Sequence, residues 1–180
     1  MMIAPLCPAL EHTRRRVRRQ RPSMQITVTI EPPDQPAVAT LLRQSDAIAA
    51  RLYPGAFRQP LTPATLSRPG IALFVAREDH GQALGCAALL DLGDGTGELK
   101  RMIVDPDHAG QGVGRHLVTA ILQSARARGF RSVLLEVGIR NVEARRLYES
   151  AGFRNRGPFG RYEPTPIATF MEADLTRRAI

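Results

Sequence analysis

Three glycines in five positions, Gly110, Gly112 and Gly114, stand between a β-rich run and an amphipathic run of this sequence. Because glycine lacks a Cβ, backbone N–H groups around it can approach an anion closely, and the start of a following helix adds partial positive charge. Each such contact contributes about 0.3–1 kcal/mol, so several amides together could hold a pyrophosphate. A tight strand-to-helix turn without any ligand would explain the same three glycines.

Two familiar nucleotide-binding motifs do not fit this loop. A Walker A motif needs Lys and then Ser or Thr after its last glycine, whereas Gly114 is followed by Arg115 and His116. A dinucleotide fingerprint would place its third glycine at Arg115 or Leu117. Glu136 lies 22 residues after Gly114, as a ribose-binding acid would, but the strand before the loop follows a hairpin instead of opening a βαβ unit.

The cysteines and histidines indicate neither nucleophilic nor metal chemistry. Cys86 lies in an apolar run without a His or Asp pattern around it, so we expect a small core residue. With Cys7 it makes no disulfide framework, which favours a reducing, cytoplasmic compartment. The four histidines, at positions 12, 80, 108 and 116, lack the spacing of metal ligands, so no metal site is expected.

Hydrophobic periodicity predicts the elements that would position these residues. Period-two runs predict strands at 25–30, 71–76, 83–90, 98–104, 133–137 and 168–175. Helical spacing predicts helices over 37–52, from the glycine loop to before Gly129, and from Asn141 to before Gly152, with at most a short helix near 63–67. The Pro-rich segment 54–70 could lie over a binding site. This order predicts the α/β class, with one mixed sheet flanked by helices.

Charge is concentrated at the start of the chain. Six arginines and one acid in residues 1–23 give +5 of the net charge of +8, so the body at 24–180 carries only +3. We interpret 1–23 as a flexible Arg-rich tail, with a segment upstream of the natural start and a nucleic-acid or membrane-surface arm as alternatives. A nucleic-acid partner is not expected for the body. No apolar run reaches the about 20 residues of a membrane span, so no membrane anchor is expected either.

Three segments together resemble the GNAT superfamily of acetyl-CoA-dependent N-acetyltransferases, over about residues 25–175. They are the strand Glu98–Val104, the glycine loop, and the segment Asn141–Phe153, which reads Asn-x-x-Ala-x-x-Leu-Tyr-x-x-x-Gly-Phe. The later Gly-Pro-Phe-Gly-x-Tyr162 is similar to small, single-domain bacterial members. The resemblance implies one GNAT domain at 24–180, with a central, mostly antiparallel sheet that splays. It also implies transfer of acetyl from acetyl-CoA directly to a primary amine, most plausibly of a small molecule. A catalytically silent acetyl-CoA sensor and a protein N-acetyltransferase stay open, and so does a homodimer, which is common in such families.

The resemblance also implies where the cofactor binds. The pantetheine arm would pair with strand backbone at Met102, Ile103 and Val104. The pyrophosphate would lie on the backbone amides of Gly110, Gln111, Gly112, Val113, Gly114 and Arg115. Asn141 would cap its helix and could also contact the cofactor. One position departs from the family pattern, because Ala109 stands where Gln or Arg is usual. The pyrophosphate site is therefore expected to consist of backbone amides, without the side-chain contact that Gln or Arg usually adds.

Two side chains are implied to take part in proton transfer. An alkyl amine with a pKa near about 10 is only about one part in a thousand neutral at pH 7, so a base must accept its proton. Glu98 occupies a position where some family members keep a catalytic carboxylate, and Glu136 is the weaker candidate. Tyr148 matches the family's tyrosine and would protonate the leaving thiolate as a general acid. Arg154, Arg156 and Arg161 would either contact the acceptor or form a solvated face.

Overall fold

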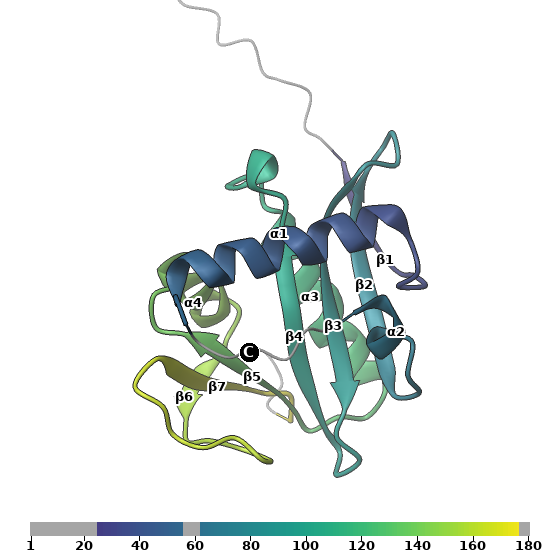
Figure 1. The fold of residues 1–180 in the computed structure, drawn as a ribbon. Coiled ribbons are helices and arrows are strands. Elements are labelled where there is room, and N and C mark those ends of the chain that lie inside the picture. The colour runs from purple at the N-terminus through teal and green to yellow at the C-terminus, as the bar shows by residue number, and fades with distance from the viewer. Residues whose placement is uncertain (1–24, 56–61, 177–180) are drawn as a thin grey trace, which may run out of the picture.

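The computed structural model describes residues 25–55 and 62–176 (Figure 1). The predicted tail at 1–23 and residues 56–61 of the Pro-rich segment lie outside these ranges. Along the chain the elements are β1 (Ile26–Ile30), α1 (Pro36–Leu52), α2 (Pro63–Leu66), β2 (Ile71–Glu78), β3 (Ala83–Asp91), β4 (Thr96–Val104), the 3₁₀ turn η1 (Pro106–His108), α3 (Val113–Ala127), β5 (Ser132–Gly138), α4 (Val142–Ser150), β6 (Arg154–Arg156) and β7 (Ala168–Asp174). No helix among the described residues has the length and apolar character needed to cross a membrane.

The strands form one sheet in the order β1-β2-β3-β4-β5-β7-β6. Within the described residues β4 and β5 run parallel, and every other neighbouring pair is antiparallel. The β4–β5 pairing covers only Thr96–Glu98 against Ser132–Leu134, although both strands continue beyond it. The two strands therefore diverge after Glu98, and the prediction of a mixed, mostly antiparallel, splayed sheet is confirmed.

Helices cover both faces of the sheet (Figure 1). The apolar side of α3 packs with residues of β2 to β5 in the larger core cluster, which also contains Tyr148 of α4 and Phe153. The apolar side of α1 and Leu66 of α2 pack against the other face, over β2, β3 and β4. Cys86 lies in this second cluster and is fully buried, as the sequence predicted. Burial raises the pKa of its thiol to about 12, so the thiolate that a nucleophile needs is absent near neutral pH.

A β-bulge interrupts β4 at Arg101, directly after Lys100. The register of β3 against β4 shifts between Cys86 and Ala88, and Arg101 has a left-handed φ of 55°. Leu99 packs in the α3 cluster, whereas Ile103 packs in the α1 cluster, although strict alternation would place both on one face. An extra residue in one strand bends it and increases its twist. The bulge thus lies three residues beyond Glu98, the last residue of β4 that pairs with β5.

The described helices and longer strands match the predicted ones to within a few residues. Two short elements were not predicted. The strand β6 is the tripeptide Arg-Asn-Arg, whose side chains are all exposed, so it has no hydrophobic alternation to detect. It exists because its backbone pairs with β7 at the sheet edge. The turn η1 arises where Asp105 accepts a hydrogen bond from the backbone of Asp107.

Candidate active site

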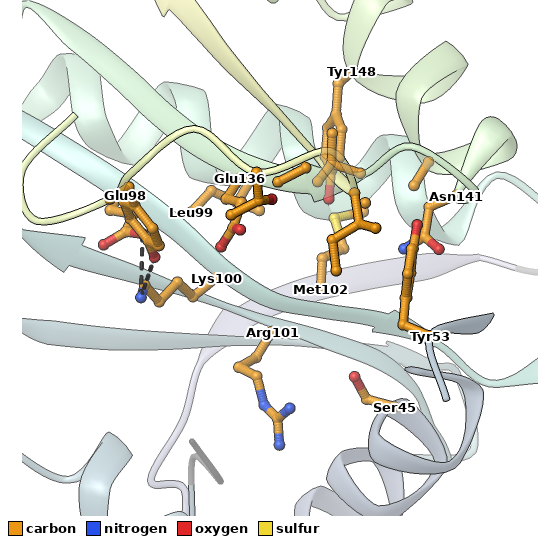
Figure 2. Close-up of a pocket in the computed structure, with 17 residues that line it drawn as sticks. Ser45, Tyr53, Glu98, Leu99, Lys100, Arg101, Met102, Glu136, Asn141 and Tyr148 are labelled. Carbon is orange, nitrogen blue, oxygen red and sulfur yellow. Dashed lines mark hydrogen bonds and ion pairs between the residues drawn. The ribbon is translucent and has the colours of Figure 1, made fainter. Parts of the chain in front are cut away.

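A cavity of about 520 Å³ opens where β4 and β5 diverge. Its walls come from the end of α1, from β4, β5 and α4, and from the segment between β6 and β7. Figure 2 shows Glu98 and Lys100 at one end of this central cavity, and Tyr148 and Asn141 toward the other. The two side chains expected to move protons, Glu98 and Tyr148, thus line one cavity although they lie on different elements.

Glu98 is nearly buried, with 5% of its surface exposed, and two polar groups contact its carboxylate. The hydroxyl of Tyr162 donates a hydrogen bond to Glu98 Oε1 over 2.6 Å, and Lys100 Nζ lies 3.2 Å from the same oxygen. Lys100 Nζ also donates to the Tyr162 hydroxyl over 2.6 Å. Burial raises the pKa of the Tyr162 phenol above its usual range, and the hydrogen bond to Glu98 and its charge raise it further. That phenol therefore keeps its proton and acts as a donor.

Tyr162 reaches Glu98 because an aromatic cluster anchors the segment that carries it. Its ring packs against Phe159 at 4.9 Å and Phe170 at 5.6 Å between centroids. Leu134 of β5 completes this small third cluster. Sequence reasoning did not assign Lys100 or Tyr162 to the site. The spacing of Glu98 and Lys100, two residues apart before the bulge, was the available signal for Lys100, since such residues share one face of a strand.

Tyr148 lies on α4 with 5% of its surface exposed. Its ring packs against Phe153, with centroids 5.6 Å apart, and its hydroxyl has no hydrogen-bond partner among the described residues. Figure 2 shows the hydroxyl end directed toward β4. Burial raises the pKa of the phenol above its ordinary value, so the group stays protonated through the neutral range. A protonated, unpartnered hydroxyl in a cavity has the form that a general acid requires.

The predicted side-chain cap by Asn141 is wrong. Asn141 does occupy the N-cap position of α4, but its side chain makes no capping hydrogen bond. A tight turn, closed by its N–H donating to Gly138 O over 3.0 Å, sets φ to −83° and ψ to 62°. These angles differ from the extended conformation in which a cap side chain reaches back to the helix amides. Asn141 instead lines the central cavity, where its buried Oδ1 has no partner among the described residues.

The glycine loop leads into α3 through two left-handed residues, Gly110 with φ 75° and Gly112 with φ 86°. Gly112 is the N-cap and has no side chain to cap with, so the N–H groups at the start of α3, from Val113 to Arg115, remain available. Gly114 has a packing role as well, because a Cβ there would lie 2.9 Å from Leu147 Cδ2 of α4. The loop therefore presents amides and permits close approach of α3 and α4.

A model of the acetyltransferase (GNAT) family matches residues 35–153. The chain belongs to this family. It is 40% identical over 151 residues to an IAA acetyltransferase of Azospirillum brasilense, an alignment that covers 83% of this chain and 98% of that relative. GNAT N-acetyltransferases take their acetyl group from acetyl-CoA, and the chain is accordingly an acetyl-CoA-dependent N-acetyltransferase.

Solved structures show the same GNAT fold. A Klebsiella pneumoniae protein described as an acyl-CoA N-acyltransferase superposes with a TM-score of 0.71 at 32% identity, covering 83% of this chain and 97% of that one. Spermidine N-acetyltransferase of Vibrio cholerae, in complex with CoA and spermine, superposes with a TM-score of 0.65 at 19% identity, covering 84% and 96% of the two chains.

The residues of this GNAT domain fit acetyl-CoA in two independent places. The backbone of Met102, Ile103 and Val104 lies beyond the paired part of β4, so its edge toward β5 lacks a strand partner, while β3 occupies the other edge. The buried, unpartnered Oδ1 of Asn141 lies in the lining of the central cavity. The residues Gly110–Arg115 are not part of that lining, but Gly114 lies beside Met102 and Val104, since a Cβ there would come within 3.4 and 3.6 Å of their side chains. Among the other predicted loop residues, Gln111 already donates its N–H to His108 O, at a long 3.4 Å.

Of the four remaining candidate residues, one lines the central cavity and three do not. Glu136 of β5 lines the cavity. Arg154, Arg156 and Arg161 are not among the residues that line it. Arg156 pairs with Glu172 at 3.2 Å, and Arg154 donates hydrogen bonds to backbone carbonyls. The interpretation as a solvated arginine face therefore fits Arg154, Arg156 and Arg161 better than acceptor contact. The described residues contain no group of three or more potential metal ligands.

Proposed function

We propose that this protein transfers the acetyl group of acetyl-CoA directly to a primary amine of a small molecule, with Glu98 as the general base and Tyr148 as the general acid. One observation carries the proposal: a nearly buried carboxylate and a buried, unpartnered phenol line a single cavity at the divergence of β4 and β5. In this proposal Glu98 would act as proton acceptor and Tyr148 as proton donor on either side of the space where the transfer would occur.

The cofactor would be held by backbone. The amides at Gly110 and from Gly112 to Arg115, at the start of α3, would bind the pyrophosphate, with the helix dipole adding to the attraction. The unpaired edge of β4 at Met102–Val104 would bind the pantetheine arm, and Asn141 would donate or accept a hydrogen bond beside it. Bound acetyl-CoA supplies an acetyl group already activated as a thioester.

Two side chains of the protein would then accept and donate protons. Glu98 accepts a proton from the acceptor ammonium, which frees the nitrogen lone pair to form the new N–C bond to the acetyl carbon. The nitrogen, which still carries one proton too many for an amide, releases it to solvent. The C–S bond breaks, and the Tyr148 hydroxyl donates its proton to the departing sulfur. General acid–base catalysis of this kind contributes about 10²–10⁴-fold in rate. The products are an N-acetylated amine and CoA, and solvent restores the two proton carriers.

Two observations support a small acceptor. The central cavity measures about 520 Å³ and must hold the acetyl end of the cofactor as well, so it suits a compact amine. The relative from Azospirillum brasilense is named for acetylation of IAA. A folded protein acceptor would have to extend a terminus or side chain into the same space.

The test is an acceptor panel scored by acetyl-CoA-dependent release of CoA thiol. The panel contains IAA, aminocarboxylates, polyamines, amino sugars and peptides with a free N-terminus. Turnover with a small amine that falls about 100-fold or more in Glu98→Gln supports the proposal. Turnover with peptides alone would favour a protein N-acetyltransferase. Stabilisation by acetyl-CoA without turnover of any acceptor would favour a sensor instead. If Glu98→Gln keeps the wild-type rate and pH profile on a true acceptor, Glu98 is not the base.

A further inference from the structure

Three side chains form a connected hydrogen-bond chain at the Glu98 end of the cavity. Lys100 donates to Tyr162, and Tyr162 donates to Glu98 Oε1, each over 2.6 Å. Lys100 Nζ also lies 3.2 Å from Oε1. All polar contacts on the Glu98 carboxylate from the described residues therefore meet at one of its two oxygens, and Oε2 accepts none.

The direction of the chain is fixed by chemistry. A Lys ammonium is only a donor, and an ionised carboxylate is only an acceptor. The Tyr162 hydroxyl between them must therefore accept from Lys100 and donate to Glu98. Its raised pKa is consistent with this assignment, because it keeps the phenol protonated. Rotation of the hydroxyl hydrogen away from Glu98 would break the short hydrogen bond to Oε1.

The positions of the three groups are fixed by two separate parts of the fold. Glu98 and Lys100 lie two residues apart on β4, before the bulge. Tyr162 arrives from the segment between β6 and β7, where the rings of Phe159 and Phe170 hold it. Because packing already restricts the Tyr162 ring, little rotamer freedom is left to lose when its hydroxyl binds Glu98.

We propose that Tyr162 and Lys100 are positioning residues that fix Glu98 through Oε1 and leave Oε2 to receive the proton of the acceptor amine. The inference rests on the proposed function of Glu98 as the base. Lys100 serves a second purpose, since Glu136 of β5 brings another carboxylate to the same cavity and Arg101 of β4 is paired with Asp46 at 2.6 Å. A cation at Lys100 offsets the repulsion between the two carboxylates.

The experiment uses Tyr162→Phe and Lys100→Met in the full chain. Tyr162→Phe keeps the aromatic packing and loses the hydroxyl, whereas Lys100→Met keeps most of the aliphatic stem and loses the charge. Each is expected to lower kcat about tenfold or more, the scale of a hydrogen bond to a charged group. KM for acetyl-CoA is expected to stay near the wild-type value in both variants, because neither side chain lies at the predicted cofactor contacts; an unchanged kcat would contradict the positioning role. Thermal unfolding of both variants checks the fold, and Lys100, which is partly exposed, tests the idea even if Tyr162→Phe folds poorly.

A double-mutant cycle with Glu98→Gln decides whether the two residues act through Glu98. If they do, Tyr162→Phe lowers kcat in the wild type but changes it less than twofold in the Glu98→Gln background. Equal losses in both backgrounds would overturn the positioning role while leaving Glu98 as the base. A Glu98→Gln variant with full activity would overturn the proposed function itself, so the two failures are distinguishable.

Discussion

Two buried tyrosines line the central cavity, and they differ in one respect. Tyr53 and Tyr148 are both 5% exposed. The Tyr53 hydroxyl accepts a hydrogen bond from the backbone N–H of Arg140 over 2.7 Å, whereas the Tyr148 hydroxyl has no such partner among the described residues. The Tyr148 hydroxyl is also not one of the fully buried atoms that lack a partner, so it opens on the cavity. The contrast separates a tyrosine that supports the structure from one whose hydroxyl is available for chemistry.

This contrast gives a prediction for a matched pair of variants. Tyr148→Phe should lower kcat about 100-fold and leave the free energy of unfolding nearly unchanged, because the hydroxyl makes no hydrogen bond to the described residues and opens on the cavity. Tyr53→Phe should lower the free energy of unfolding by about 1 kcal/mol, because it leaves the backbone N–H of Arg140 without its hydrogen-bond acceptor. Steady-state kinetics and urea unfolding measure the two effects. A Tyr148→Phe enzyme with wild-type kcat would exclude the general-acid role.

At the scale of elements, α3 begins and ends with a left-handed glycine. Gly112 (φ 86°) is its N-cap, and Gly129 (φ 77°) follows its C-terminus. A Cβ at Gly129 would meet nothing within 4 Å, and one at Gly112 would come only within 3.9 Å of His116. The cost of alanine at either position is therefore mainly the left-handed backbone itself. The two ends differ in that only the N-terminal one presents free amides.

Gly112→Ala and Gly129→Ala should therefore separate stability from cofactor binding. Each is expected to lower the free energy of unfolding by a similar amount, about 1–2 kcal/mol, because an L-residue with a side chain is strained at positive φ. Only Gly112→Ala should also weaken CoA binding, since it displaces the amides that start α3. Isothermal titration with CoA and chemical unfolding provide the two readouts. Equal loss of CoA affinity in both variants would argue against a pyrophosphate site at this loop.

At the scale of the whole molecule, the edge of the sheet is secured by an ion pair. Glu31, directly after β1, accepts two hydrogen bonds from the guanidinium of Arg77 on β2, at 2.8 and 2.7 Å. Gln35, at the N-terminus of α1, donates to the same carboxylate over 3.0 Å. These contacts hold the pKa of Glu31 at about 2, well below its ordinary 4.5. The pair thus joins β1, β2 and α1 at one point.

The free energy of unfolding should depend on pH through the Glu31 carboxyl. A carboxyl whose pKa is lowered on folding contributes stability that is complete above its unfolded pKa of 4.5 and is lost as pH falls through about 2. Glu31→Gln should cost about 1–2 kcal/mol at pH 7, less than the full pKa shift implies because solvent reaches both partners. Urea unfolding at pH 7, 4.5 and 2 should show the difference from wild type shrinking between the last two values. A constant difference at all three would contradict this assignment.

The sequence predicted the order of the longer elements and the tight turn before α3 because these depend on local periodicity and on glycine spacing. The assignment of that turn to the cofactor rests on the family resemblance and stays a prediction. It did not predict β6, which depends only on backbone pairing with β7. It also could not place Tyr162 beside Glu98, since the two residues are 64 positions apart and meet through aromatic packing. The side-chain cap by Asn141 failed because a turn set by Gly138 overrides the usual N-cap dihedrals. Tertiary contacts, not local preference, decided each of these cases.

The bulge at Arg101 amounts to one extra residue in β4. Leu99 and Met102 contact the α3 cluster, and Ile103 contacts the α1 cluster. Omitting Arg101 would leave these positions in plain alternation with every apolar residue on its present face. The hydrophobic pattern of β4 is therefore that of an ordinary strand into which one extra residue has been inserted. Because a bulge bends its strand, a single in-frame insertion into an unbroken sheet could open the cleft without any change to the core that supports it.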